Sequence, residues 1–460
     1  MMRGRYEIFV RTGALPAVSK TDKIEPRKLK GFRDLLPQQA RLKKEITDVI
    51  WKNAVLAGFD SIETPALEYA DTLLGTGEET DKEVYRFLDH GERSVALRFD
   101  MTVPFARYVV ENFSELTFPF KKLQIGNSWR GEKPQKGRYR EFCQADLDII
   151  GVDSLSADVE VISCIVQNLN ELLPKPFTMS LGHRIILSAL IRKSIPEIGP
   201  NEFKVLIAID KLAKIGKAAV LKIISELSGV KAGEADDLLN KLLRKNSEGD
   251  SDLDALKELF TGDLETVYEI TRLQSSAAII RQLVGHTGHG QVRVDLSIAR
   301  GLGYYTGIVF ETTIDGLDGF GSISSGGRYN GLVNRFSSQE LPGIGGSIGV
   351  DRLLAAMEQL QTTSEVVRNG VFIALGGADC REYGFELLQK LRQQKIVSDI
   401  ALKEGKLGNQ FKYADKRRFA FVLTIGGDEL AAKTMSLKNL ATGEEHRSIS
   451  QVEGFQLLSR

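Results

Sequence analysis

The feature that most constrains the fold is a change of hydrophobic period along the chain. Residues 95–103, 121–130, 139–150 and 291–314 alternate with period two and are rich in Val, Ile, Phe and Tyr, which predicts strands of a half-buried sheet. Residues 185–290 instead carry short apolar runs separated by Gly, Pro, Ser and Asp clusters, a pattern typical of short helices. We therefore expect a sheet domain that is interrupted by a helical insertion.

Two further helices and a second domain are also expected. Apolar residues in 37–58 recur at three-to-five-residue spacing, which predicts an amphipathic helix that ends at Gly58. Another helix is expected at 351–361, followed by a polar linker that ends in Asn-Gly. Strand-like and helix-like segments then alternate from residue 371 to 460, which predicts a compact α/β domain.

Composition excludes several classes of protein. The 460 residues hold 61 Lys and Arg against 61 Asp and Glu, so nucleic-acid binding requires local basic patches. The three cysteines are widely spaced without a CxxC pair, which disfavours a disulfide framework or a zinc site and favours a reducing cytoplasm. A membrane span or signal peptide is not expected. Residues 1–30 carry eight Lys or Arg against three acids and are interpreted as a solvated N-terminal extension, with an organelle transit segment or an RNA-contacting tail as alternatives.

Polar side chains gather on one face of two predicted strands. In the segment 95–103, alternation places Asp100 and Thr102 on one face, which is either a plain surface or a ligand-binding face. In the segment 139–150, alternation places Gln144, Asp146 and Asp148 on one face and apolar residues on the other. Neighbouring acids repel, so we expect an ammonium group, an imidazole or a metal beside them.

Cationic and glycine-rich segments predict anion recognition. The loop within 129–140 holds five basic residues and one acid, and arginine forks suit bidentate contact to phosphate oxygens. A glycine-rich segment before residue 350 runs into a helix whose N-terminus, with Arg352 in its first turn, is an anion site. Arg300 ends a predicted strand and is followed by Gly301 and Gly303, which allow close approach of the backbone to a ligand.

Local patterns also make predictions about neighbouring residues. Tyr304 and Tyr305 are adjacent on a predicted strand, so at most one of them is expected to line a given pocket. Gly326 and Gly327 predict a turn.

The tail carries a basic segment, residues 403–418, with six Lys or Arg against two acids. Phe411 and Tyr413 interleave with these charges and either stack on unpaired nucleotide bases or lie in the core of an amphipathic helix.

Together and in this order, the segments resemble the histidyl-tRNA synthetase family, within class II of the aminoacyl-tRNA synthetases, over residues 26–460. GFRDLLP at 31–37 is similar to motif 1, WRGEKPQKGRYREFCQ at 129–144 to motif 2, and GGSIGVDRL at 345–353 to motif 3. The histidine-specific signals are ARGLGYYTG (299–307), SSGGRYNGLV (324–333) and LRFDMTVPFARY (97–108). The tail, with KLGNQFKYADKRR, resembles the family's anticodon-binding domain.

The resemblance implies an α+β fold, with an antiparallel-sheet catalytic domain that carries a helical insert and a C-terminal α/β anticodon-binding domain. The expected segments are an N-terminal extension (1–25), a first catalytic part (26–184), a helical insertion (185–290), a second catalytic part (291–362) and the anticodon-binding domain (371–460).

The resemblance also implies roles for individual residues. Catalytic contact to the reacting phosphate is expected from Arg300 and Arg130. The residues expected to bind ATP are Arg130, Glu132, Arg138 and Arg352. Those expected to bind histidine are Asp100, Thr102 and Gln144 for its α-amino group, and Asp148 and Tyr305 for its imidazole. The candidates for contact with tRNA are Lys133, Gln135, Lys136, Lys412, Lys416 and Arg417. Gly303 departs from the family pattern, which usually has Asp at this position.

The implied activity is ATP-dependent ligation of L-histidine to histidine tRNA through a histidyl-adenylate, by a cytoplasmic homodimer that uses ATP and Mg²⁺ and binds no membrane. No protein-bound metal site is expected. The alternatives are a catalytically silent regulatory subunit of ATP phosphoribosyltransferase, which typically lacks the anticodon-binding domain, and a sensor of histidine and tRNA.

Overall fold

A computed structural model describes residues 24–75, 78–135, 137–285, 288–299, 304–317, 319–360, 368–403 and 405–458. The chain divides into two compact units, Met1–Thr362 and Thr363–Arg460, and each is described by itself. Nearly all of the predicted extension, and residues 361–367 of the predicted linker, lie outside the described residues.

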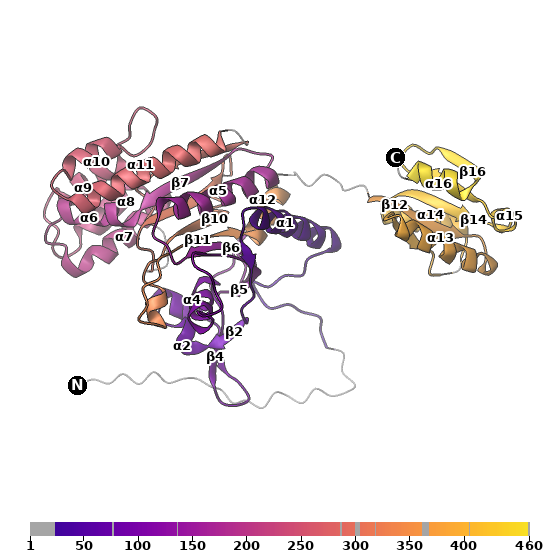
Figure 1. Ribbon diagram of the computed structural model, residues 1–460, viewed down its shortest axis with the longest axis horizontal. Helices are drawn as coiled ribbons and strands as arrows, with labels where there is room; N and C mark the ends of the chain where they lie inside the picture. Colours follow the sequence, from indigo (N-terminus) through magenta and orange to yellow (C-terminus); the bar gives the residue numbers. More distant parts are fainter. Residues whose placement is uncertain are drawn as a thin grey trace. The chain divides into compact units, whose positions relative to one another are not determined.

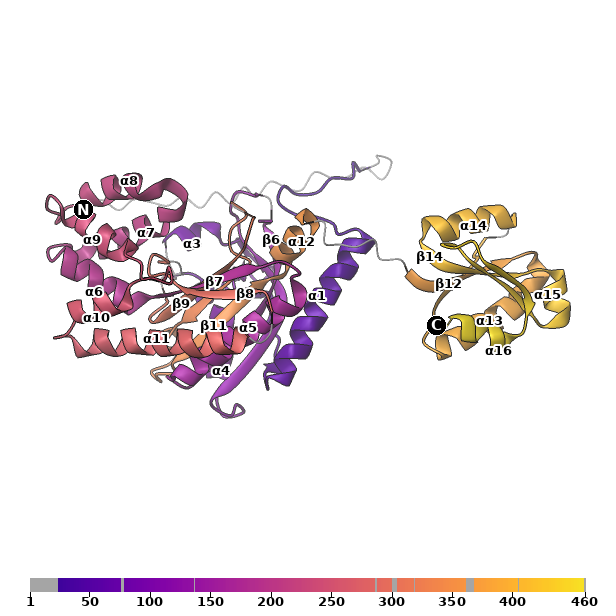
Figure 2. The same cartoon turned by 90° about the horizontal axis from the view of Figure 1, so that it is seen from above.

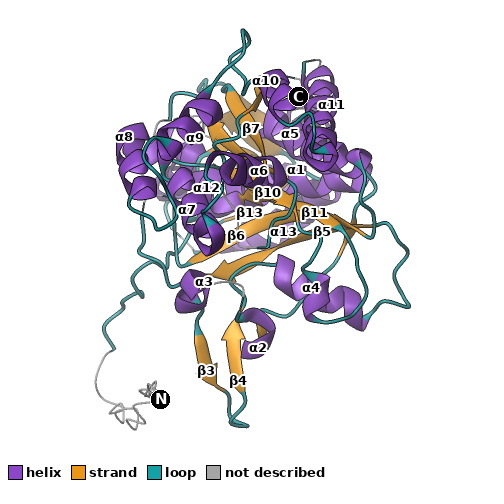
Figure 3. Ribbon diagram, turned by 90° about the vertical axis from the view of Figure 1, so that its left-hand side faces the viewer, coloured by secondary structure: helices purple, strands orange, loops and turns teal. Residues whose placement is uncertain are grey.

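The first unit is built on an eight-stranded sheet with the order β1-β5-β6-β11-β10-β9-β7-β8 (Figure 3). Neighbouring strands are antiparallel except for the pairs β1/β5 and β7/β8 at the two edges. The predicted antiparallel sheet is therefore confirmed. Its strands are β1 (Asp60–Ser61), β5 (Phe120–Trp129), β6 (Glu141–Ile150), β7 (Phe177–His183), β8 (Gly290–Val294), β9 (Ile308–Ile314), β10 (Ser324–Arg328) and β11 (Gly343–Gly349).

One face of this sheet is covered by α1 (Pro37–Leu56), α5 (Leu155–Leu172) and α12 (Val350–Gln359), with α11 (Leu264–Val284) lying along α5 (Figure 2). Ala145 and Leu147 of β6 are fully buried in the same apolar core as Ile46 and Ile50 of α1. The apolar face predicted for β6 and the helices predicted at 37–58 and 351–361 are therefore confirmed.

The other face carries α2 (Ala70–Leu73), α4 (Thr102–Glu111) and a three-stranded sheet of order β2-β4-β3, formed by β2 (Leu67–Tyr69), β3 (Arg86–Leu88) and β4 (Ser94–Leu97) (Figure 1). A short helix, α3 (Glu78–Glu83), precedes β3. Phe99, Phe105 and Tyr329 are buried between these elements and the sheet.

The predicted strand at 95–103 is wrong beyond Leu97. Asp100 accepts a hydrogen bond from the backbone N–H of Val103 at 3.1 Å, and Thr102 is the first residue of α4. A carboxylate at this spacing satisfies an otherwise unpaired amide of the first helical turn, and Pro104 is tolerated there because it has no N–H to pair. Local capping therefore overrides the alternating pattern.

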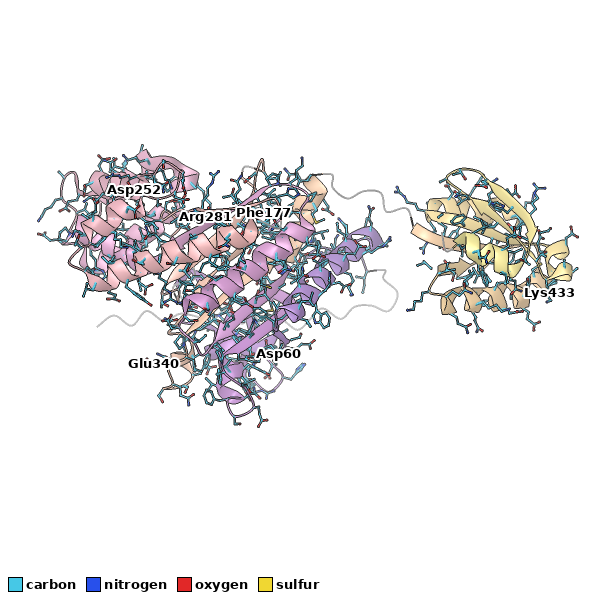
Figure 4. The ribbon with its side chains drawn as sticks, turned by 45° about the horizontal axis from the view of Figure 1, so that its top comes forward. Asp60, Phe177, Asp252, Arg281, Glu340 and Lys433 are labelled. Carbon is cyan, nitrogen blue, oxygen red and sulfur yellow. The ribbon has the colours of Figure 1, made fainter. Side chains whose placement is uncertain are left out.

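The residues between β7 and β8 form a long helical connection between two neighbouring parallel strands. Its elements are α6 (Arg184–Ser194), a 3-10 turn at Gly199–Asn201, α7 (Glu202–Asp210), α8 (Leu212–Ser225), α9 (Glu234–Leu243), α10 (Leu253–Leu259) and α11. Arg281 of α11, labelled in Figure 4, extends from the helix. It donates to the carbonyl of Val292 in β8 at 3.0 Å and to the carboxylate of Asp250. The helices predicted for this stretch are therefore present, and α11 is anchored to the sheet.

Two other local predictions are wrong. The strands predicted within 291–314 are present as β8 and β9 at its two ends, but residues 295–299 and 304–307, also predicted as strand, are not strand. Gly326 and Gly327 lie inside β10, opposite Gly346 and Gly345 of β11, rather than in a turn. A Cβ built on Gly326 would lie 2.4 Å from Cζ of Phe310, so these glycines serve close packing between strands. A 3-10 turn follows at Val333–Arg335.

The second unit is an α/β domain around a five-stranded sheet with the order β13-β12-β14-β15-β16. The first three strands in this order are parallel and the others antiparallel. Its elements are β12 (Arg368–Leu375), a 3-10 turn (Ala378–Cys380), α13 (Arg381–Gln393), β13 (Val397–Ile400), α14 (Leu407–Lys416), β14 (Phe419–Ile425), α15 (Gly427–Ala432), β15 (Met435–Asn439), β16 (Glu445–Ile449) and α16 (Gln451–Leu458). The predicted α/β tail is confirmed. In neither unit is any described helix long and apolar enough to cross a membrane.

Candidate active site

A cavity of about 180 Å³ opens between the β5–β6 loop, β6, β11 and the start of α12. Its lining includes the four residues that the sequence predicts to bind ATP, Arg130, Glu132, Arg138 and Arg352, together with Gln144. Three of these four are cationic. The predicted gathering of basic side chains around one cleft is therefore present in the structure.

The arginines of this cavity are held by neighbouring polar groups. Arg130 donates from Nε to the carbonyl of Phe99 at 3.0 Å, and Arg138 forms an ion pair with Glu132 at 3.2 Å. Arg352 donates to the carbonyl of Ser322. Because a guanidinium carries five N–H donors, an arginine anchored in this way keeps donors for phosphate oxygens.

The first turn of α12 is fixed by Asp351, which the sequence analysis did not single out. This buried carboxylate accepts hydrogen bonds from the side chains of Arg33 and Lys43 and from the backbone N–H of Cys143. It therefore links the segment of the first sequence motif, α1 and β6 to the helix that carries Arg352. An acid in the first turn of a predicted helix was the available sequence signal.

The polar face of β6 continues from the cavity into the interior. Gln144, Asp146 and Asp148 lie on this face as predicted, and Asp148 pairs in register with Lys122 of β5. Nζ of Lys122 lies 2.8 Å from Oδ2 of Asp148, and the Lys122 side chain has no exposed surface. The ammonium group of Lys122 is thus the positive charge expected beside the acids. The sequence did not identify this lysine because the register between the strands was unknown.

Asp148 has a second hydrogen-bond partner and very little space. Oη of Tyr329 donates to Oδ1 of Asp148 at 2.8 Å. Gly345 of β11 pairs with Asp148 in the sheet, and a Cβ on Gly345 would lie 1.8 Å from that same Oδ1. Glycine at 345 is therefore required by the position of the Asp148 carboxylate.

Asp100 lies beside two tyrosines. Oη of Tyr304 is 3.4 Å from Oδ2 of Asp100, and Tyr304 also hydrogen-bonds the side chain of Thr102. The rings of Tyr304 and Tyr305 meet edge to face with centroids 4.9 Å apart. Both tyrosines stand close to the acids of this site, and neither is among the residues that line the cavity. They lie outside the described strands, so the strand predicted for them is wrong and alternation does not apply to them.

Burial shifts several pKa values in this cluster. Desolvation raises the pKa of Asp146 to about 7 against the opposing charge of Lys122, and it also raises the pKa of Asp100. The pKa values of Tyr304 and Tyr305 are raised by burial and by neighbouring acids, so both phenols remain neutral hydrogen-bond donors. Perturbed titratable groups that gather next to a cleft indicate a functional site.

Four more of the predicted site residues lie away from this cluster or outside the described residues. Arg300 and Lys136 fall outside the described residues, as does Gly303. Lys133 and Gln135 are exposed on the β5–β6 loop.

The other tRNA candidates, Lys412, Lys416 and Arg417, are exposed on or just after α14 in the second unit. The two aromatic residues between them have different surroundings. Phe411 packs against the apolar cluster beneath the helix, whereas Tyr413 is 47% exposed with the Arg417 guanidinium 5.9 Å from its ring.

An antiparallel sheet that carries an arginine-lined cleft at the β5–β6 loop and at the start of α12 defines the class II aminoacyl-tRNA synthetases. A family model described as histidyl-tRNA synthetase matches residues 31–353, and a model described as an anticodon binding domain matches residues 370–458. The chain belongs to the histidyl-tRNA synthetase family.

Individual relatives agree with this assignment. The chain is 40% identical over 427 residues to a histidine–tRNA ligase of Rhodopirellula baltica, which covers 92% of this chain and 95% of that protein. It is 39% identical over 452 residues to a histidine–tRNA ligase of Helicobacter hepaticus, and this match covers 95% of this chain and 99% of that protein.

Solved structures show the same fold. The crystal structure of histidyl-tRNA synthetase from Nostoc sp. PCC 7120 superposes with a TM-score of 0.83 at 30% identity, covering 95% of this chain and 100% of that chain. An ATP phosphoribosyltransferase regulatory subunit/histidyl-tRNA synthetase from Bacillus halodurans C superposes with a TM-score of 0.72 at 23% identity, covering 88% of this chain and 100% of that chain. At that identity the second likeness concerns the fold alone.

Proposed function

We propose that this protein ligates L-histidine to histidine tRNA, using ATP to form a histidyl-adenylate that then transfers its acyl group to the terminal ribose. Membership of the family supports this activity. The observation that carries it is that one face of β6 contributes to two adjacent sites. Gln144 lines the arginine-rich cavity, and Asp148 on the same face lies in the buried acidic cluster.

The first step needs positioning rather than a side-chain nucleophile. The carboxylate of histidine attacks the α-phosphorus of ATP in line and pyrophosphate leaves. Arg130, Arg138 and Arg352 neutralise the charge that develops on the phosphate oxygens, and Arg300 contacts the α-phosphate. Preorganised donors of this kind contribute most in a site that excludes water.

The acidic cluster suits a cationic amino acid with two ring nitrogens. Asp100, Thr102 and Gln144 hold the α-ammonium, and Asp148 with Tyr305 recognise the imidazole. Asp148 is held in place by Lys122 and Tyr329, so its orientation is fixed before the substrate arrives. A site that hydrogen-bonds both ring nitrogens rejects side chains that leave those partners unpaired, by about 10⁴–10⁵ in comparable enzymes.

Mg²⁺ enters this proposal as a companion of ATP. Among the described residues there is no group of three or more His, Cys, Asp or Glu side chains placed to hold a metal. Mg²⁺ is commonly bound by one or two carboxylates together with substrate phosphates, and Glu132 supplies a carboxylate at the cavity wall. Glu132 would hold the ion, which would neutralise phosphate charge.

A homodimer belongs to the same proposal. Large apolar side chains are exposed on α1 and on the small sheet of the first unit, an arrangement typical of surfaces that pair with another protein. They are Trp51, Leu56, Leu67, Tyr69, Phe87 and Leu88. We propose that a second copy of the chain covers them.

The remaining assignments are proposals about location and partners. We propose the domain limits given above and a cytoplasmic location, both of which fit the proposed activity. We also propose that histidine tRNA contacts the β5–β6 loop and α14. The basic residues exposed on α14 support the last of these.

Histidine-dependent exchange of labelled pyrophosphate into ATP tests the proposed function directly, with other amino acids as controls. We expect exchange with histidine alone, followed by charging of histidine tRNA. A protein that binds histidine without exchange would instead be a regulatory subunit or a sensor, and the proposal would be wrong.

Arg300 is tested in the same assay. Arg300→Ala is expected to abolish adenylate formation while tRNA binding, measured by filter retention, stays within about twofold, because the proposed contact is to the reacting phosphate. Equal loss of both would contradict the assigned role. Gly303→Asp, which introduces the carboxylate usual in the family, shows whether a carboxylate at this position supports Arg300.

A further inference from the structure

One buried acid of the sheet has no task in the proposed reaction. Asp146 is 4% exposed and lies between Gln144 and Asp148 on the polar face of β6. In the sheet it pairs with Gln124 of β5 on one side and with Ser347 of β11 on the other. Cross-strand partners share a face, so the Asp146 and Ser347 side chains stand side by side.

A chain of hydrogen bonds leads from Asp146 to the cavity. Nε2 of Gln144 donates to Oγ of Ser347 at 2.7 Å, and the side chain of Ser347 hydrogen-bonds the Asp146 carboxylate. Gln144 and Ser347 both line the cavity, whereas Asp146 is not among its lining residues. Ser347 therefore joins a buried charge to a side chain that a ligand can reach.

The polarity of this chain is set by the acid. An ionised carboxylate only accepts hydrogen bonds, and a serine hydroxyl has a single proton, so Ser347 donates to Asp146 and accepts from Gln144. The Gln144 amide is then fixed with its nitrogen towards Ser347. Its Oε1 is buried and has no hydrogen-bond partner within the described part of the chain. An unpaired buried carbonyl costs about 1–3 kcal/mol, which a bound N–H donor would relieve.

We propose that Asp146 is a positioning residue for the amino-acid substrate: acting through Ser347, it orients the Gln144 amide so that the carbonyl oxygen accepts a hydrogen bond from the substrate's α-ammonium. This inference rests on the proposed function, because it assigns the reason why Gln144 presents oxygen rather than nitrogen. With a reversed amide, the NH₂ group would face the ammonium and two donors would oppose each other.

The surrounding charges make the arrangement responsive to the substrate. Lys122 on β5 and the Ser347 hydroxyl on β11 favour the ionised form of Asp146, whereas burial and the acids Asp148 and Asp100 favour the protonated form, and the pKa lies at about 7. An added ammonium group near this face favours ionisation. The orientation of Gln144 is therefore strengthened when the substrate binds.

The test compares Michaelis constants in the pyrophosphate exchange assay. Asp146→Asn keeps the shape of the side chain but can either donate or accept, so it no longer dictates the direction of the Ser347 proton. We expect the KM for histidine to rise about 10–100-fold, the range for a lost hydrogen bond to a charged group, with the KM for ATP within about twofold of wild type. Asp60→Asn, at an exposed aspartate of β1 (Figure 4), is the matched control and should change neither constant.

A substrate analogue separates positioning from general damage. Imidazole propionate has the imidazole and carboxylate of histidine but lacks the α-ammonium, so its inhibition constant in the same assay should be unchanged in Asp146→Asn. Ser347→Ala interrupts the chain at another residue and should give the same selective effect. The double variant should lose no more than either single variant, because both act through Gln144.

Each outcome has a definite meaning. A rise of both KM values, or weaker inhibition by the analogue, would show that Asp146 and Ser347 only stabilise the floor of the site and would overturn the inference, as would unchanged histidine KM in both variants. If Asp146→Asn does not fold, Ser347→Ala alone decides. Absence of histidine-dependent exchange in the wild-type protein would instead refute the proposed function.

Discussion

Replacing Lys122 by methionine should destabilise the first unit substantially. At 2.8 Å the attraction between Lys122 and Asp148 is about 6 kcal/mol for an effective dielectric constant of 20, and desolvation of the two charges offsets most of it. Removing only the lysine leaves Asp148 as a buried charge without its cation. Removal of one partner from a buried ion pair lowers the free energy of unfolding by about 3–5 kcal/mol.

This loss is large enough to measure by calorimetry. A unit with about 330 described residues has an unfolding entropy of about 0.7 kcal/mol/K, so the Tm of the first unit should fall by about 4–7 °C. Lys121→Met is the matched control, because Lys121 is the preceding residue and its partner Glu160 is open to solvent, so that removing this lysine leaves no buried charge. Solvent-accessible ion pairs contribute about 0–1 kcal/mol to the free energy of unfolding, so the Tm of the control should fall by no more than about 1–2 °C.

A second variant tests the cause. Asp148→Asn removes the charge but keeps an oxygen for the hydroxyl of Tyr329, so Lys122→Met combined with Asp148→Asn should regain much of the lost Tm. If Lys122→Met melts at the same temperature as the Lys121→Met control, or if the double variant melts lower still, the buried ion pair does not stabilise the first unit.

Three further changes have expected outcomes. Arg352→Ala should lower the pyrophosphate exchange rate by about 10²–10³-fold, and Arg352→Lys should recover only part of it, because lysine lacks the planar fork. The pKa of Asp146 is raised from 3.8 to about 7 in the folded state, so its contribution to stability is present below pH 4 and is lost as the pH rises through 7. As the pH rises from 5 to 8, the free energy of unfolding of Asp146→Asn, measured in urea, should therefore increase relative to that of wild type. A difference between the two proteins that does not change with pH would contradict the raised pKa of Asp146. Single alanine variants of Lys412, Lys416 and Arg417 should each weaken tRNA binding without changing pyrophosphate exchange. Each should also reduce the slope of log K for tRNA against log salt concentration by about one. An unchanged slope would show that α14 does not contact the tRNA.

The parts of the site that depend on a single strand were predictable from the sequence. The polar and apolar faces of β6 follow from period two alone, and the structure shows both. Lys122 was not identified, although it lies in a segment correctly predicted as a strand, because its pairing with Asp148 depends on the register between β5 and β6. Register is a property of two strands together and cannot be read from either one.

Other failures have local causes. The pattern around Asp100 alternates like a strand, but a cap on the backbone N–H of Val103 begins a helix there. The adjacent glycines 326 and 327 have the composition of a turn, yet they pair with β9 and β11 as part of β10. Glycine is needed at these positions because Phe310 and the neighbouring backbone leave no room for a Cβ. In the first case a capping contact within the segment decides the conformation, and in the second case pairing with two other strands decides it.

The space around Gly345 couples two positions that are far apart in the sequence. An alanine at 345 would collide with Oδ1 of Asp148, so it would displace that acid and leave Lys122 without its counter-ion. Substitution of either residue therefore changes which residues the other position tolerates. Among relatives of this chain, a larger residue in place of Gly345 should occur only together with a smaller residue in place of Asp148, and the two sites should change as a pair during divergence.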